Sequence, residues 1–252
     1  MPSSTIPLDT ITERRQQICR LSLVIPTLNE GQTIQQLLQR LVPALDRSIP
    51  RAYELWIVDD CSEDDTEERV RQLQRYYPQV HWLQRHRERG LASATIAGWQ
   101  QARGEILGVM DGDLQHPPEL VPQLLQAIGQ GADVAIASRY GRDGSIAGQW
   151  GWWRQLASRI AMTLSRWVVP QVVRNVSDPM SGFFLVRRQA IGDRPLQPVG
   201  YKVLLEVLAK GRIHRVREVG YRFDTRFGGS SKVSWHHSWV YIWHLIRLRL
   251  GR

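Results

Sequence analysis

The 252-residue sequence has little cysteine and no metal-binding histidine motif. Cys19 and Cys61 are its only cysteines, they form no CxxC pair, and the seven histidines show no HExxH-type spacing. A disulfide framework needs several paired cysteines, and a structural zinc site needs clustered cysteine and histidine ligands. The sequence therefore predicts neither of these, and it fits a reducing compartment.

Long hydrophobic runs are also missing. The longest stretch without Asp, Glu, Lys or Arg covers residues 233–246, whereas a bilayer core needs about 20 apolar residues. Residues 1–19 contain no continuous hydrophobic region of the kind that a secretory signal requires. We therefore expect no membrane-spanning segment, and we expect residues 1–20 to be a flexible lead-in.

Acidic residues are fewer than basic ones. The chain has 33 Lys and Arg against 24 Asp and Glu, which gives a formal net charge of +9. Such an excess predicts an anionic partner, which could be a nucleic acid, an anionic membrane surface or a phosphorylated substrate. The cations are spread over loops and form no recognised nucleic-acid-binding module, so we expect no nucleic acid as partner.

The chain does contain a regular alternation of apolar runs and amphipathic segments. Short apolar runs predict strands, and residues at helical spacing follow each of the first four; the expected strands are 21–25, 54–58, 80–83, 106–110 and 134–137, with helices at 30–45, 65–76, 91–102 and 118–128. This alternation predicts an α/β fold with a mostly parallel central sheet and helices on both faces. Beyond residue 140 we expect a basic amphipathic helix at 150–169, strands at 183–186 and 216–221, and a helix at 201–209.

The predicted strand at 106–110 ends at two aspartates, Asp111 and Asp113. In an extended chain both would project to the same side, together with Gln115. Hard divalent cations such as Mg²⁺ prefer oxygen ligands of this kind, and Gly112 would leave room for a bulky ligand. The alternative is a solvated turn whose acids cap the next helix, and the tripeptide alone does not decide between the two.

Other polar clusters follow the same edge of the predicted sheet, where ligands bind in α/β folds. Asp59 and Asp60 could accept hydrogen bonds from a base or ribose, or they could serve with Ser62 and Asp64 as helix caps. The segment Arg226–Lys232 could be a phosphate clamp or a basic surface turn. A diphosphate would give these cations and the acidic pair a common purpose.

Tryptophans recur every four residues at Trp235, Trp239 and Trp243, with arginines near the end of the chain. A helix with this pattern is typical of a membrane interface, and residues 235–250 would reach about 24 Å at roughly 1.5 Å per residue. A terminal helix packed on the core is the alternative. We expect three segments: the lead-in at 1–20, a catalytic domain at 21–232 and an amphipathic helix at 233–252.

The ordered motifs together resemble the dolichol-phosphate mannose synthase group, which are inverting family-2 glycosyltransferases of GT-A fold that act on polyprenyl phosphates. The resemblance runs from about residue 21 to residue 243. Its motifs are Val24–Glu30, Val58–Asp60, Arg85 with Gly90–Leu91, Asp111–Glu119, Ser138–Tyr140, Ser177–Phe184, Gly200–Lys202 and Arg226–Lys232.

The resemblance implies a nucleotide-sugar donor, GDP-mannose in the best-known members, a polyprenyl or dolichyl phosphate acceptor, and Mg²⁺ or Mn²⁺ as cofactor. It implies donor contacts from Pro26, Leu28, Glu30, Val58, Asp59, Asp60, Asp111, Gly112, Asp113, Lys202, Arg226 and Lys232. It further implies metal ligation by Asp111, Asp113 and Gln115, acceptor-phosphate contacts from Arg139 and Ser181, and catalytic roles for Asp113 and Arg139.

The sequence departs from the family pattern in two places. Leu28 stands where many relatives have tyrosine, which removes an aromatic contact with the base and leaves UDP-glucose or another UDP-sugar as an alternative donor. Many relatives continue into transmembrane helices beyond the equivalent of residues 235–250. We therefore expect a peripheral protein on the cytoplasmic face of a membrane, or a truncated chain. A non-catalytic membrane-surface protein is the alternative of another class.

Overall fold

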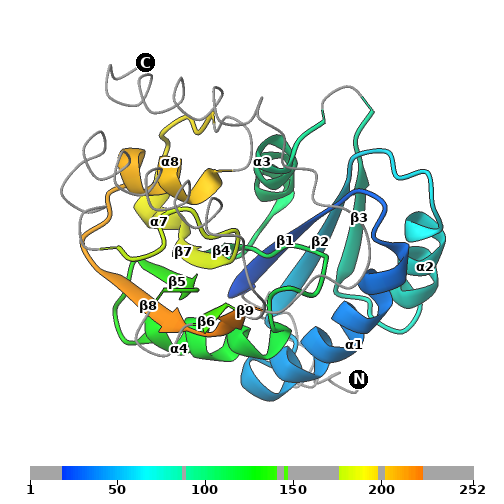
Figure 1. The fold of residues 1–252 in the computed structure, drawn as a ribbon, viewed down its shortest axis with the longest axis horizontal. Coiled ribbons are helices and arrows are strands. Elements are labelled where there is room, and N and C mark those ends of the chain that lie inside the picture. The colour runs from blue at the N-terminus through cyan, green and yellow to red at the C-terminus, as the bar shows by residue number, and fades with distance from the viewer. Residues whose placement is uncertain (1–18, 87–88, 141–144, 147–175, 198–201, 224–252) are drawn as a thin grey trace, which may run out of the picture.

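The computed structural model describes residues 19–86, 89–140, 145–146, 176–197 and 202–223 (Figure 1). These residues form a central sheet of seven strands in the order β3-β2-β1-β4-β7-β5-β8. The strands are β1 (Leu21–Thr27), β2 (Tyr53–Asp59), β3 (Val80–Gln84), β4 (Ile106–Val109), β5 (Val134–Ser138), β7 (Phe184–Arg187) and β8 (Val216–Gly220). All neighbouring pairs are parallel except those of β7, which runs antiparallel to both β4 and β5.

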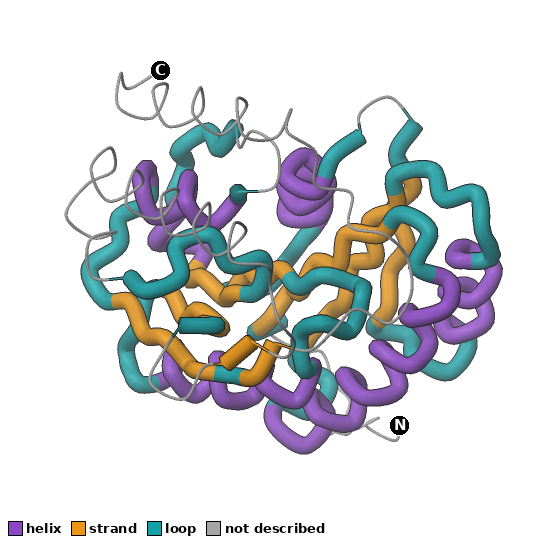
Figure 2. Tube along the Cα trace, in the orientation of Figure 1, coloured by secondary structure: helices purple, strands orange, loops and turns teal. Residues whose placement is uncertain are grey.

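Helices cover both faces of this sheet, as Figure 2 shows. In Figure 1, α1 and α4 lie below the sheet, and α3 and α8 lie above it. The helices are α1 (Gly31–Ser48), α2 (Thr66–Gln74), α3 (Leu91–Gln101), the 3₁₀ turn η2 (Pro118–Leu120), α4 (Val121–Gly129), α7 (Arg188–Ile191) and α8 (Val203–Lys210). A separate parallel pair joins β6 (Ser145–Ile146) to β9 (Arg222–Phe223).

Apolar side chains at helical and strand spacing build two cores, one on each face of the sheet. Along α1 the residues that face the sheet are fully buried, and they are the ones that the helical spacing predicted: Ile34, Leu37, Leu38, Leu41 and Leu45. On the other face the indole N–H of Trp99 donates to the Gly108 carbonyl oxygen at 3.0 Å, and its ring lies edge-on to Phe184. These layers hold the strand ends in fixed positions.

The prediction of a mostly parallel sheet with helices on both faces is confirmed. Each expected strand and helix within the described residues is present, with bounds that shift by a few residues. The antiparallel insertion of β7 between β4 and β5 was not expected, nor were α7 and the β6–β9 pair. Sequence periodicity reports which residues are buried but not which strands become neighbours, so this order could not be read from it.

No helix among the described residues has both the length and the apolar character needed to cross a bilayer. The amphipathic helices expected at 150–169 and 235–250 lie outside the described residues, as does most of the lead-in. The segment Arg226–Lys232 also lies outside them.

Candidate active site

The loops that leave β1, β2 and β4 converge at one edge of the sheet, and each bends through an unusual backbone conformation. Asn29, Cys61 and Leu114 have φ angles of 57°, 58° and 60°. Residues other than glycine rarely adopt positive φ, and such conformations tend to cluster at functional sites. This edge, which we call the crevice, is where α/β sheets usually bind ligands.

Polar side chains fasten the first two of these loops to each other. Ser62 Oγ accepts a hydrogen bond from the Asn29 amide at 2.8 Å, and Asn29 Oδ1 accepts one from the Glu63 amide at 2.8 Å. Asp64 accepts from the amides of Gly31 at 3.0 Å and Thr66 at 3.1 Å, which are the first residues of α1 and α2. Asp64 thus accepts from the first amide of both helices, although the N-cap position of α2 is Asp65, which makes no side-chain capping bond.

Asp59 and Asp60 are both buried at the end of β2. Asp59 accepts hydrogen bonds from Thr27 Oγ1 at 3.0 Å and from the Ser62 amide at 2.8 Å. Asp60 forms an ion pair with Arg85 Nε at 2.8 Å and accepts from the Gly90 amide at 2.6 Å. Both acids thus organise the loops of the crevice, and their contact with a nucleotide stays a prediction.

The remaining residues expected at the base and ribose also lie on this edge. Pro26 and Val58 are register partners on β1 and β2, and Val58 is fully buried. Glu30 precedes α1, where its amide donates to Thr66 Oγ1 at 3.0 Å and its Oε2 atom accepts from Thr33 Oγ1 at 3.1 Å. Leu28 lies beside it in the β1–α1 loop, so the structure brings the predicted set together.

The two aspartates of the DxD segment lie just beyond β4, but not in an extended chain. β4 ends at Val109 and residues 112–116 form bends, so the alternation that predicted a common side does not apply here. Asp113 is 7% exposed and its Oδ1 atom accepts from the Gln115 amide at 3.1 Å. A side-chain carbon at Gly112 would meet Thr27, Glu30 and Ile25 at 3.5–3.6 Å, so this side of Gly112 is already filled by protein side chains and provides no open space for a ligand.

Asp111 carries an unusual carboxylate. Its Oδ1 atom is buried and has no hydrogen-bond partner within the described part of the chain. Its Oδ2 atom lies 3.4 Å from His116 Nε2, and a side-chain carbon placed on Gly182 would lie 2.9 Å from the same oxygen. A buried carboxylate oxygen without a partner costs free energy unless a ligand satisfies it.

This donor set fits a divalent cation that shares its ligands with a substrate. The orphaned Asp111 oxygen and the neighbouring Asp113 supply the hard oxygen ligands that Mg²⁺ or Mn²⁺ takes. Among the residues described, no group of three His, Cys, Asp or Glu side chains gathers closely enough to hold a metal. Mg²⁺ is commonly held in proteins by one or two carboxylates together with substrate phosphates.

Arg139 enters the crevice from the end of β5 and is held by a carboxylate. Its Nε and Nη2 atoms donate to the two oxygens of Asp178 at 2.7 and 2.8 Å. Burial opposes the charged form, but the Asp178 carboxylate outweighs it and raises the pKa of Arg139 above its ordinary value. The Ser177 and Asp178 amides in turn donate to Glu218 on β8, at 2.9 and 3.1 Å.

Ser181, the other residue expected at the acceptor phosphate, is buried close by. Its hydroxyl donates to the Ala137 carbonyl oxygen at 2.7 Å and accepts from the Phe183 amide at 3.1 Å. These bonds tie the loop before β7 to the end of β5. A contact between Ser181 or Arg139 and a phosphate stays a prediction.

Lys202 precedes α8 and is buried, with its ammonium group against the sulfur of Met180. Burial, reinforced by the nearby Arg139 charge, lowers the pKa of Lys202 to about 7. A buried ammonium gains most from an anionic ligand, so this position suits a phosphate group.

Sequence reasoning missed several residues of the crevice. Asp178 and Glu218 orient Arg139, and Tyr221 contacts His116, yet none of the three had been assigned a role. Their signals are weak because the partners are far apart in the chain: Tyr221 is 105 positions from His116, and Glu218 is 40 from Asp178. Only the unexpected placement of β7 beside β5 brings these segments together.

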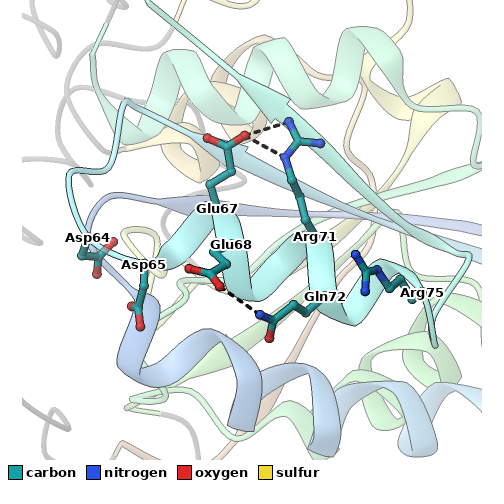
Figure 3. A pocket seen from close by; sticks show the side chains of 7 residues that line it. All are labelled: Asp64, Asp65, Glu67, Glu68, Arg71, Gln72 and Arg75. Carbon is teal, nitrogen blue, oxygen red and sulfur yellow. Dashed lines mark hydrogen bonds and ion pairs between the residues drawn. The ribbon is translucent and has the colours of Figure 1, made fainter.

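A concave region of about 560 Å³ lies along α2 and is lined by charged and amide side chains. Figure 3 shows two pairs among these side chains along the helix, Glu67 with Arg71 and Glu68 with Gln72. Arg71 pairs with Glu67 at 2.7 Å, and Gln72 donates to Glu68 at 3.1 Å. Such exposed i,i+4 pairs are typical of a solvated helix face, and we assign no function to this region.

The sequence is similar to a known protein family and to several characterised proteins. The family described as "Glycosyl transferase family 2" matches residues 22–194. A dolichol-phosphate mannosyltransferase of Pyrococcus furiosus is 40% identical over 91% of this chain and 63% of its own length. One from Saccharomyces cerevisiae is 34% identical over 84% of this chain and 80% of its own length. The chain thus spans less than two thirds of the Pyrococcus relative.

Solved structures show the same architecture. Glucosyl-3-phosphoglycerate synthase from Mycobacterium tuberculosis, crystallised with Mn²⁺, UDP and glucosyl-3-phosphoglycerate, superposes with a TM-score of 0.67. The alignment covers 92% of this chain and 79% of that one, at 19% sequence identity. At this identity the likeness speaks for the fold alone, and it confirms the expected GT-A architecture.

Proposed function

The chain belongs to glycosyl transferase family 2, and from this premise we propose that it transfers a sugar from a nucleotide sugar to a polyprenyl phosphate. The donor we propose is GDP-mannose and the acceptor is a dolichyl-type phosphate, as the names of the related mannosyltransferases suggest. The observation that carries the proposal is the buried Asp111 oxygen that has no hydrogen-bond partner among the described residues, two positions before Asp113 and in a crevice that also holds Arg139 and Lys202.

We propose that Asp111, Asp113 and Gln115 hold a divalent cation, Mg²⁺ or Mn²⁺. When bound, the cation neutralises negative charge that grows on the departing nucleoside diphosphate. The Mn²⁺ present in the structural neighbour supports this assignment. Lys202, together with Arg226 and Lys232 from outside the described residues, would add positive charge at the same phosphates.

The acceptor needs no protein base. A phosphate monoester has a second pKa near 6, so at neutral pH it is largely a dianion and its oxygen is already a nucleophile. That oxygen attacks the anomeric carbon, the bond from this carbon to the diphosphate breaks, and the nucleoside diphosphate leaves with the electron pair. The configuration of the sugar is inverted. Arg139, oriented by Asp178, and Ser181 are the residues that we place at the acceptor phosphate.

A direct experiment tests the proposal. The protein is incubated with Mn²⁺, polyprenyl phosphate and either GDP-mannose or UDP-glucose labelled in the sugar. We expect label from GDP-mannose to enter the lipid fraction. A protein that binds vesicles but transfers no label from either donor would contradict the proposal and support a non-catalytic membrane-surface role.

A UDP-sugar is the second candidate donor. Leu28 replaces an aromatic residue at the expected base contact, and the structural neighbour was crystallised with UDP. Titration of GDP and UDP in the presence of Mn²⁺ separates the two. We expect the protein to bind GDP more tightly, and tighter binding of UDP would favour the second donor.

We also propose that the protein works at a membrane surface, with residues 233–252 as an interfacial helix on the cytoplasmic side and residues 21–232 as the catalytic domain. The spacing of Trp235, Trp239 and Trp243 supports this, because tryptophan and arginine suit the headgroup layer. A lipid-linked acceptor gives such a helix an evident purpose.

A further inference from the structure

We propose that His116 and Tyr221 are positioning residues, which hold the Asp111 carboxylate so that its Oδ1 atom is available to the divalent cation. The proposal rests on the proposed function, because it assigns these residues to the cation of the same site. It adds two residues that touch neither the substrate nor the reacting atoms.

The three residues form a continuous line of contacts behind the crevice. Tyr221 Oη lies 2.6 Å from His116 Nδ1, and His116 Nε2 lies 3.4 Å from Asp111 Oδ2. His116 is 3% exposed and Tyr221 is 5% exposed, whereas the Asp111 side chain is 29% exposed. The line therefore runs from the protein interior to the partly exposed Asp111 side chain, whose Oδ1 atom is itself buried.

The chemistry of the line has a direction. In the arrangement that we propose, the Tyr221 hydroxyl donates to His116 Nδ1, which lies within hydrogen-bond distance of it. The imidazole must then carry its proton on Nε2, which is the atom that faces Asp111 Oδ2. One carboxylate oxygen of Asp111 thus faces a donor, and the other, Oδ1, is the one without a partner in the described structure.

Packing fixes the positions of these groups. The His116 ring lies edge-on to Phe183, with ring centroids 5.4 Å apart. The Gly182 backbone also lies close to Asp111, since a side-chain carbon there would come within 2.9 Å of Oδ2. Groups that orient a metal-binding side chain typically change metal affinity or activity by about 10–100-fold when removed. This is the size of effect that we expect.

Replacement of Tyr221 by phenylalanine tests the proposal with little disturbance of packing. The matched control is Tyr53→Phe. Tyr53 is equally buried, and its hydroxyl donates to Asp46 at 2.8 Å. It is the first residue of β2 and so lies at the end of the strand opposite the crevice. Mn²⁺ affinity in the presence of GDP is measured by electron paramagnetic resonance, and thermal unfolding is recorded for each variant. We expect Tyr221→Phe to weaken Mn²⁺ binding about tenfold, and Tyr53→Phe to leave it unchanged.

Two His116 variants provide the second test. Glutamine can place an N–H near the position of Nε2, whereas leucine keeps the bulk and removes the donor. We expect His116→Gln to retain Mn²⁺ affinity within about threefold, and His116→Leu to lose tenfold or more. In the transfer assay the concentration of the nucleotide-sugar donor is varied. The loss of activity in His116→Leu should then appear mainly in kcat/KM at limiting Mn²⁺, and it should diminish at saturating Mn²⁺.

Three results would overturn the proposal. They are wild-type Mn²⁺ affinity in Tyr221→Phe and His116→Leu, an equal loss in Tyr53→Phe, and an absence of Mn²⁺ binding by the wild-type protein with either GDP or UDP. The proposed function is judged separately by label transfer in the wild-type protein. A protein that binds Mn²⁺ as expected but transfers no sugar would reject the function and leave the positioning roles in place.

Discussion

At the scale of single residues, burial decides how the charged groups of the crevice behave. Asp111 and Lys202 are opposite in charge, and each is placed where water cannot satisfy it fully: one has an oxygen without a partner in the described structure, the other a pKa lowered to about 7. Both lose this penalty when a ligand of opposite charge arrives. A bound metal–diphosphate would satisfy the two at once.

Lys202 predicts a pH dependence of donor binding. Because its pKa is about 7, the ammonium form is present below pH 7 and is lost as the pH rises through that value. Affinity for GDP with Mn²⁺ should therefore fall between pH 7 and 8.5, measured by calorimetry. Lys202→Arg should flatten the profile, since arginine stays charged throughout. An identical slope in both proteins would remove Lys202 from the phosphate site.

The same lysine predicts a change in stability of definite sign. Between pH 7 and about 10.4 the unfolded chain keeps a proton that the folded chain has released. Unfolding then takes up protons, so the free energy of unfolding rises with pH across this window. Lys202→Met removes the buried charge and should therefore raise the free energy of unfolding. This increase should be largest below pH 7 and shrink toward pH 10. Thermal melts of the two proteins check this.

At the scale of elements, the loop before β7 supplies residues that organise the crevice. It carries Asp178, which orients Arg139, Ser181, which ties the loop to β5, and Gly182, which lies against Asp111. Because β7 is inserted antiparallel between β4 and β5, its first residues start at the crevice edge. The loop thereby joins the cationic half of the crevice to its acidic half.

Two glycines give a matched test of this arrangement, one beside Asp111 and one at the end of α4, away from the crevice. Gly182→Ala places a carbon 2.9 Å from Asp111 Oδ2 and must displace the carboxylate, whereas the added carbon of Gly129→Ala meets nothing within 4 Å. We expect Gly182→Ala to lower sugar transfer at limiting Mn²⁺ by about 10-fold or more. Gly129→Ala should keep activity within about threefold. Equal activities would show that the Gly182 contact is unimportant.

Sequence reasoning predicted the elements well and their neighbours less well. The apolar spacing of residues 34–45 predicted the buried face of α1, and the sequence also predicted that Asp111 and Asp113 follow a strand, which the structure shows as β4. Periodicity carries no information on pairing, so the place of β7 and its contacts with residues from β5 and β8 stayed out of reach. The contacts from Tyr221 through His116 to Asp111 depend on that pairing, and no local sequence pattern predicts them.

At the scale of the whole molecule, a net charge of +9 and a cluster of tryptophans near the C-terminus predict attachment to an anionic membrane surface. Replacing Trp239 and Trp243 with alanine should weaken binding to liposomes that contain anionic lipid, measured by co-sedimentation. Trp99→Phe, a change in the core of the sheet, serves as the control and should leave partitioning unchanged. Undiminished binding after loss of both tryptophans would assign that helix to the core.

The claim that unites these scales is that Asp111 and Asp113 hold the cation that permits departure of the nucleoside diphosphate. Asp113→Asn tests it most directly, because asparagine keeps the shape of the side chain and an oxygen to accept from the Gln115 amide. The control is Asp133→Asn, whose carboxylate accepts from the amides of His214 and Arg215.

The measurement is transfer of labelled sugar to polyprenyl phosphate at saturating Mn²⁺, with unfolding temperatures recorded in parallel. The account predicts that Asp113→Asn loses activity by at least about 10²-fold while its unfolding temperature stays close to that of the wild-type protein. It also predicts that Asp133→Asn stays active. Full activity of a folded Asp113→Asn protein would contradict the account.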